Sequence, residues 1–255
     1  MGQTEPAASP RREAKFPVSS STIWQIFDLI REGETHLHRI LRDSWWAPRS
    51  SAFGRRGGAL FFLGYNLKMI GVDEVGRGCW AGPLLVVAAQ SAGKLPPGLK
   101  DSKLLSRHQR ETVYGLLYTV CRFGEGWVSA AEIDQHGLAK ALRLGTARAL
   151  KNLGTQTDEE IILDGKVNYL PAKFTAGRCL VDADNLVPIV SAASVHAKVT
   201  RDNFMAKLAT KHPAYNFEQH VGYGTKAHVE AISRYGLIKY VHRLSYAPIA
   251  KAAGL

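Results

Sequence analysis

Apolar residues along this chain occur either in short continuous runs or at helical spacing, and the two patterns predict different elements. Runs of strand length occupy residues 69–72, 84–89, 161–163 and 178–181, and residues 123–128 form a further candidate strand. Helical spacing follows Ser106, recurs over residues 138–149 and continues through an alanine-rich stretch at 188–209, and Thr225 and Gly236 bracket one more helix. Strands that alternate with helices predict an α/β domain with a mixed sheet.

The first 62 residues differ in composition from the rest. Residues 1–20 are rich in Pro, Ser, Ala and charge, which predicts a disordered tail. Residues 21–62 predict a short helical N-terminal extension, capped at Ser21, and a linker that carries Arg49, Arg55 and Arg56. We expect this segment to add affinity for phosphates without taking part in chemistry. The predicted catalytic domain therefore comprises residues 63–255.

Charge, cysteine content and hydropathy limit the kinds of partner and site that this chain can have. The formal net charge of +11 and the pI of about 9.7 favour a polyanionic partner, although a solvated basic surface explains the same charge equally well. Three scattered cysteines without a CxxC pair argue against a disulfide framework and a zinc site. The early apolar run at residues 59–72 is interrupted by Asn66 and Lys68, and no secretory signal is apparent. We expect a cytoplasmic protein that has no membrane partner.

Four acidic residues share a position relative to the predicted strands. Asp73, Glu74, Asp164 and Asp184 each lie at or just beyond the C-terminal end of a strand, where ligand sites form in open α/β sheets. Clustered carboxylates suit hard divalent cations such as Mg²⁺, and two such ions can drive phosphodiester hydrolysis. Any one of these acids could instead cap a turn. Adjacent Asp73 and Glu74 also face opposite sides of a regular strand, so both reach one site only if the strand ends there or if Glu74 contributes through its backbone.

The glycine-rich loop after Glu74 admits a second interpretation. Gly76, Gly78 and Ala81 match G-x-G-x-x-A, the fingerprint of dinucleotide-binding proteins. That motif must open a helix, whereas here Gly82 and Pro83 lead into another strand-like run. Two acids just before the loop would also repel a pyrophosphate. The loop is therefore interpreted as a close-approach segment or a plain connecting turn.

Six further motifs follow one another along the chain. They are GVDEVGRGCWAGP at residues 71–83, DSKLLS at 101–106, ILDG at 162–165, SAASVHAKVTRD at 191–202, GYGT at 222–225 and HRLSYAP at 242–248. In this order they resemble the motifs of the ribonuclease HII family. Together they span most of the chain after residue 67, which makes the resemblance far more specific than any single motif.

The resemblance implies a ribonuclease H-like mixed sheet flanked by helices, with a small helical C-terminal part. It implies Mg²⁺- or Mn²⁺-dependent hydrolysis of RNA/DNA hybrids and of duplex DNA that contains single ribonucleotides, leaving 3′-hydroxyl and 5′-phosphate ends. We also expect the protein to be a monomer. The implied metal ligands and catalytic residues are Asp73, Glu74, Asp164 and Asp184. The implied substrate-binding residues are Gly76, Arg77 and Gly78 at the 2′-hydroxyl, Tyr223 on the neighbouring deoxyribose, and Ser102 and Lys103 on the phosphates. Ser102 would equally suit the start of a helix.

Several positions depart from the family pattern. Asp182, Val221, Lys166 and the pair Cys79–Trp80 stand where other residues are usual, and Asp182 adds an acid that could raise a neighbour's pKa or bind metal. Asp202 is expected to pair with Lys198 at i,i+4. His196 is expected in the core, and His220 is expected to contact either a phosphate or solvent. A nuclease fold that binds nucleic acid with little or no cutting remains the alternative to an active enzyme.

Overall fold

The computed structural model describes residues 69–252, except for residues 97, 98 and 100–104. The predictions for residues 1–20 and 21–62, the start of the catalytic domain at residue 63, and the predicted contacts of Ser102 and Lys103 lie outside the described residues.

A five-stranded mixed sheet forms the centre of the described region, in the order β3-β2-β1-β4-β5. The strands are β1 (Ile70–Val75), β2 (Leu84–Ser91), β3 (Cys121–Val128), β4 (Ile161–Asp164) and β5 (Gly177–Leu180). β1, β2 and β3 pair antiparallel, whereas β4 and β5 run parallel to β1. The predicted α/β class with a mixed sheet is confirmed.

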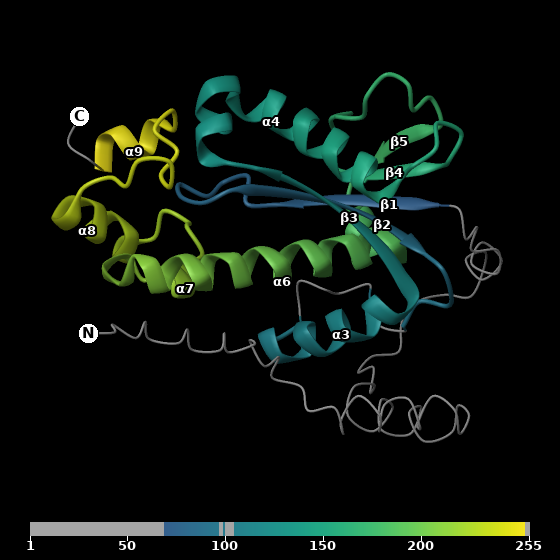
Figure 1. Cartoon of the computed structure of the whole chain (residues 1–255), viewed down its shortest axis with the longest axis horizontal. Coiled ribbons are helices and arrows are strands. Elements are labelled where there is room, and N and C mark those ends of the chain that lie inside the picture. Colours follow the sequence, from purple (N-terminus) through teal and green to yellow (C-terminus); the bar gives the residue numbers. More distant parts are fainter. Residues whose placement is uncertain (1–68, 97–98, 100–104, 253–255) are drawn as a thin grey trace, which may run out of the picture. The chain divides into compact units, whose positions relative to one another are not determined.

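Helices cover both faces of this sheet (Figure 1). α4 (Ala130–Leu153) packs on β2 and β3, and α6 (Pro188–Lys211) crosses the opposite face against β1 and β2, with α3 (Arg107–Val120) packed on α6. The short elements are α5 (Ala183–Leu186), η2 (Pro213–Tyr215), α7 (Phe217–His220), α8 (Lys226–Tyr235) and α9 (Ala247–Ala252). Within the described ranges, every helix is too short or too polar to cross a membrane.

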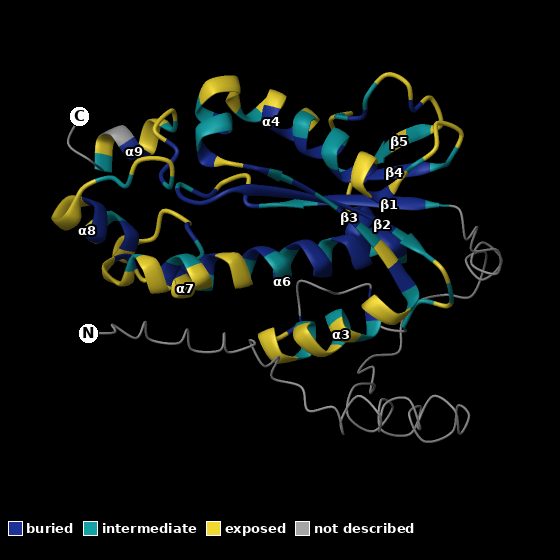
Figure 2. Cartoon of the chain, in the orientation of Figure 1, coloured by how far each residue is buried: buried dark blue, intermediate teal, exposed yellow. Residues whose placement is uncertain are grey.

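The apolar run of β2 is continuous because both of its faces are buried (Figure 2). Successive side chains point to opposite faces, so Val86 and Ala88 pack beneath α4, whereas Leu85, Val87 and Ala89 pack against α6 and α3. A central strand between two helical layers explains why this segment lacks the alternation of a half-exposed strand.

Local signals located several helix ends correctly. The predicted capping box of Ser106 and Gln109 starts α3, and Thr225 caps α8. Other boundaries were wrong, and two of them have a clear structural cause. The first strand continues to Val75, because β2 pairs with it up to Val75 opposite Leu85. The helix expected from residue 138 begins at Ala130, ahead of a break at Gly137, whose φ is 74°.

Candidate active site

All four predicted acids line one pocket of about 430 Å³. Its walls come from the end of β1, the loop that follows it, the end of β4 and the start of α5, together with three residues of α6 and one residue each of α3 and the segment before α8. The loop residues Gly76, Arg77 and Gly78 and the aromatic side chain of Tyr223 line the same pocket. The structure therefore brings together every predicted site residue that it describes.

Asp73 reaches the pocket from the α6 face of β1. Gly71 lies on the same face, where an added Cβ would stand 2.5 Å from the backbone of Ile189, so glycine lets the start of α6 approach the strand. This close packing buries the Asp73 carboxylate beside Ser194 of α6, with which it forms a hydrogen bond. The backbone N–H of Glu74 donates a second bond to Asp73 Oδ1, at 2.7 Å.

Glu74 lies on the other face of the strand and still lines the pocket. Pairing between β1 and β4 ends at Val72 opposite Leu163, so the last part of β1 extends beyond its parallel neighbour. The side chain of Glu74 is thereby open to the pocket, where its Oε1 lies 3.0 Å from Arg77 Nη1. Asp73 and Glu74 point to opposite faces of β1, yet both reach one site because β4 ends before β1 does.

Asp164 and Asp184 are linked through the backbone. Asp164 is the last residue of β4, and its Oδ1 accepts a 2.8 Å hydrogen bond from the N–H of Ala183. Asp184 follows Ala183 in α5, is 1% exposed, and has its own carbonyl bonded by the Ser191 hydroxyl. These bonds hold the end of β4, the start of α5 and α6 together around the pocket.

The carboxylates raise one another's proton affinity. Burial raises the pKa of Asp73 well above its usual value, and the negative charges of Glu74 and Asp164 raise it further. Burial also raises the pKa of Glu74, an effect that Arg77 opposes and that the charges of Asp164 and Asp184 reinforce. Because these carboxylates are buried and repel one another, a cation that binds among them would stabilise their charged forms.

The donor set suits a hard divalent cation, since it consists of carboxylate oxygens beside a hydroxyl. The acids do not form a closed metal centre, however. In the part of the chain that the structure describes, no three His, Cys, Asp or Glu side chains are grouped as a ready metal site. Glu74 is instead drawn to Arg77.

The glycine loop, defined as residues 76–83, leads directly into β2 and not into a helix, which confirms that it is no dinucleotide-binding motif. Gly76 has φ +92°, a conformation that side chains rarely adopt. At Gly78 an added Cβ would meet only Tyr223 Cε1, at 3.8 Å. Tyr223 is 42% exposed, so its ring presents an open face beside this loop.

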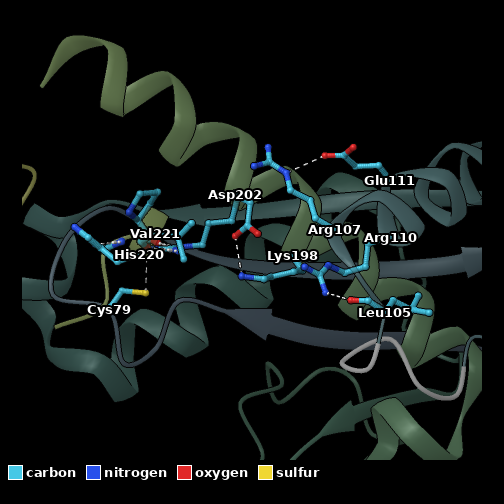
Figure 3. A network of polar contacts seen from close by, with 12 residues as sticks. Cys79, Leu105, Arg107, Arg110, Glu111, Lys198, Asp202, His220 and Val221 are labelled. Atoms are coloured by element: carbon cyan, nitrogen blue, oxygen red, sulfur yellow. Dashed lines mark hydrogen bonds and ion pairs between the residues drawn. The ribbon is translucent and has the colours of Figure 1, made fainter. Parts of the chain in front are cut away.

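The residues that depart from the family pattern either lie outside the pocket or pack behind the segments that line it. Asp182 is exposed in a left-handed conformation, with φ 57°, and does not line the pocket. Cys79 is fully buried, and its thiol lies 3.6 Å from the carbonyl oxygen of Val221 (Figure 3). Trp80 packs on Gly224, where an added Cβ would stand 2.2 Å from the indole. The unusual pair Cys79–Trp80 therefore supports the segment that carries Tyr223.

Two basic residues of the pocket were not predicted as site residues. Arg110 enters from α3, with a hydrogen bond to the carbonyl of Leu105, and Lys198 enters from α6 (Figure 3). Lys198 also forms the predicted i,i+4 pair with Asp202, at 2.9 Å. Arg110 follows the DSKLLS motif closely, but only the packing of α3 on α6 shows that it faces the acids.

The buried histidines have specific partners. His196 is 1% exposed, as expected of a core residue, and its Nε2 lies 2.8 Å from Glu125 Oε1. The expectation that His220 contacts phosphate or solvent is wrong. Its ring is buried, bonds the carbonyl of Tyr215 at 2.8 Å and stacks on His228.

Comparisons with known proteins agree with this geometry. The profile of the family described as Ribonuclease HII matches residues 70–249. A ribonuclease HII of Wolbachia sp. subsp. Brugia malayi is 40% identical over 181 residues, which cover 70% of this chain and 87% of the relative.

Two solved structures show the same fold. The ribonuclease HII of Archaeoglobus fulgidus, solved in complex with PCNA, superposes with a TM-score of 0.60 at 24% identity, covering 72% of this chain and 96% of that one. Bst-RNase HIII, solved in complex with Mn²⁺, has a TM-score of 0.57 at 21% identity, covering 73% of this chain and 69% of that one. Since the family profile spans more than half of the sequence and the Wolbachia relative exceeds 30% identity over most of its length, the chain belongs to the ribonuclease HII family of hydrolytic nucleases.

Proposed function

We propose that this enzyme hydrolyses the RNA strand of RNA/DNA hybrids and also cuts at single ribonucleotides embedded in duplex DNA. The family carries ribonuclease H activity, and one observation supports the finer assignment. The four carboxylates, residues 76–78 of the glycine loop and Tyr223 line the same pocket. If the reacting phosphate binds beside the acids, its sugar would therefore lie next to the glycine loop and Tyr223, which are suited to recognise it.

Asp73, Glu74, Asp164 and Asp184 would hold Mg²⁺ or Mn²⁺. The all-oxygen donor set and the raised pKa values of Asp73 and Glu74 support this assignment, as does the Mn²⁺ complex of the fold relative Bst-RNase HIII. When bound, such ions supply an activated water and neutralise charge that develops on the phosphate.

The chain's own cations orient the substrate. Arg77, Arg110 and Lys198 line the pocket with the acids and can bind phosphates on either side of the cut. In the reaction, a water molecule gives up one proton as its oxygen forms a bond to phosphorus, the bond from phosphorus to the 3′ oxygen breaks, and that oxygen takes up a proton. The products are a 3′-hydroxyl and a 5′-phosphate.

Recognition of the ribonucleotide would be divided between two segments. Backbone groups at Gly76 and Gly78 can approach a 2′-hydroxyl, which both donates and accepts hydrogen bonds. The exposed ring of Tyr223 suits the sugar of a following deoxynucleotide, which lacks that hydroxyl. The enzyme would thereby read an RNA-to-DNA step, acting as a cytoplasmic monomer on duplex substrates.

Cleavage of labelled duplexes in Mg²⁺, Mn²⁺ or EDTA tests the proposal. Each duplex carries either an all-RNA strand or a single ribonucleotide. We expect both duplexes to be cut with either metal and neither with EDTA. Binding of both duplexes without cutting in either metal would instead support a nucleic-acid-binding protein on a nuclease fold.

A further inference from the structure

Arg201 of α6 is a fully buried cation whose hydrogen bonds go to backbone carbonyls. Its exposure is 0%, and its Nε donates to Pro83 O at 2.8 Å. Its Nη1 donates to Val221 O at 2.9 Å and its Nη2 to Ala81 O at 3.2 Å. Burial of a cation is costly unless its donors are satisfied, so this set of carbonyl oxygens stabilises the guanidinium in one orientation.

The three carbonyls belong to two segments that are far apart in sequence. Pro83 and Ala81 lie in the glycine loop, and Val221 begins the tyrosine loop, defined as residues 221–225. The loops also bond directly, since the N–H groups of Trp80 and Ala81 donate to Gly222 O at 2.8 and 3.2 Å. Arg201 therefore lies at the junction between the two loops that carry the residues proposed to recognise the sugars.

Glycines allow both loops to close around this junction. An added Cβ at Gly76 would stand 2.4 Å from Arg201 Nε, and one at Gly222 would stand 2.3 Å from Ala81 O. Both glycines have positive φ, +92° and +89°. Close approach to Arg201 is thus a second reason for glycine at residue 76, besides access for a substrate.

On the pocket side, the two loops meet at Gly78 and Tyr223. The ring atom Tyr223 Cε1 lies 3.8 Å from where a Cβ of Gly78 would be. The buried thiol of Cys79 contacts Val221 O from the same side (Figure 3). Any change in the separation of the loops would move the ring of Tyr223 relative to the backbone at Gly78.

We propose that Arg201 is a positioning residue that fixes the glycine loop and the tyrosine loop at one separation, so that the ribose and the following deoxyribose are read as a unit. The inference rests on the proposed function. A planar guanidinium presents its donors in a rigid fork that can bridge three carbonyls, whereas the single ammonium of lysine cannot hold the same three directions. Arg201 would act on selectivity through the loops, without contact with substrate.

Arg201→Lys tests this role, because it keeps the buried charge and loses the fork. The measurement is the ratio of kcat/KM for a duplex with one ribonucleotide to kcat/KM for an all-RNA hybrid, taken well below the Tm of each variant. We expect the ratio to fall by about tenfold, a loss confined to the substrate that needs both loops. Arg148→Lys is the matched control. Arg148 also donates to a backbone carbonyl, that of Trp127, and it bonds Glu132, so its hydrogen bonds involve neither the glycine loop nor the tyrosine loop.

An unchanged ratio for Arg201→Lys, or an equal fall for Arg148→Lys, would overturn the inference. Tyr223→Ala separates this failure from that of the proposed function. If Tyr223→Ala lowers the ratio and Arg201→Lys does not, only the positioning role fails, whereas a wild-type enzyme that cuts neither duplex refutes the proposed function itself. If Arg201→Lys does not fold, Gly222→Ala tests the same role, because its Cβ would force the two loops apart. An unchanged ratio for Gly222→Ala would also overturn the inference.

Discussion

The Arg77 guanidinium lies 3.0 Å from the Glu74 carboxylate, so one proposed substrate-binding residue neutralises one proposed metal ligand. This pair places a positive charge where a divalent cation would bind. Arg77→Ala should therefore lower the Mg²⁺ concentration needed for half-maximal rate, because the cation no longer competes with Arg77, while KM for duplex rises. Kinetic titration with Mg²⁺ measures both.

Arg77→Lys is the control, since it keeps the charge and should shift the Mg²⁺ requirement less. Because the pair is partly exposed, we expect either change to alter the free energy of unfolding by no more than about 1 kcal/mol. A higher Mg²⁺ requirement in Arg77→Ala would contradict this account of the pair.

The carboxylates should matter for rate far more than for folding. Asp73→Asn and Asp164→Asn should each lower kcat by at least about a hundredfold, because each removes charge that holds the ions. Asp73→Asn should not lower Tm, since it removes a buried acid whose pKa is raised by burial and by its neighbours. Asp182→Asn is the matched control, because Asp182 is exposed outside the pocket. Full cleavage by Asp73→Asn at saturating Mg²⁺ would refute the assignment.

The two glycines of the loop should respond differently to substitution. Gly76→Ala should lower stability by about 1–3 kcal/mol, because φ is positive there and the Cβ would meet Arg201. Gly78→Val should keep its Tm and lose cleavage, since protein atoms leave room for a Cβ but a bound sugar would not. Melting curves and rates for both variants separate these effects. A Gly78→Val enzyme with wild-type activity would show that no substrate group comes close to this residue.

The sequence predicted those elements of the fold that apolar runs and helix-capping residues mark locally. The apolar runs located the strands, and Thr225 and Gly236 bracket α8 as expected. The end of β1 was misplaced because it depends on pairing with β2, and no local residue marks where a partner strand stops.

The parts of the site that sequence missed depend on distant contacts. Arg201 bonds Pro83, 118 residues away, and Arg243 bonds the carbonyl of Arg77, 166 residues away. Both arginines fall inside family motifs, at residues 191–202 and 242–248, but nothing in their local pattern shows that they are buried. Arg110 was missed because only the packing of α3 on α6 shows that it lines the pocket, whereas the four acids were predicted because strand ends and family motifs both indicated them.

A buried histidine pair predicts loss of stability in acid. His228 Nδ1 donates to Tyr223 O at 2.9 Å, and His242 Nδ1 accepts from the N–H of Ile238 at 2.8 Å. His242 Nε2 must therefore donate to His228 Nε2, 3.2 Å away, when both rings are neutral. Burial lowers the pKa of each histidine to about 4.

Because these folded-state pKa values lie below the ordinary value of about 6.5, the unfolded chain binds protons first as the pH falls. The contribution of this pair to Tm should thus be constant above about pH 6.5 and fall progressively toward pH 4. His242→Gln, which retains an amide donor, should reduce the slope of Tm against pH. An identical slope in that variant would assign the acid sensitivity to other groups.

Mapping of cleavage in duplex DNA that contains one ribonucleotide shows whether the enzyme cuts at that nucleotide. The matched all-DNA duplex serves as the comparison, with both incubated in Mg²⁺ and their ends analysed chemically. We expect one cut at the ribonucleotide, with a 3′-hydroxyl and a 5′-phosphate, and no cut in the all-DNA duplex. Equal cutting of the two duplexes, or an intact ribonucleotide strand beside a cleaved all-RNA hybrid, would contradict it.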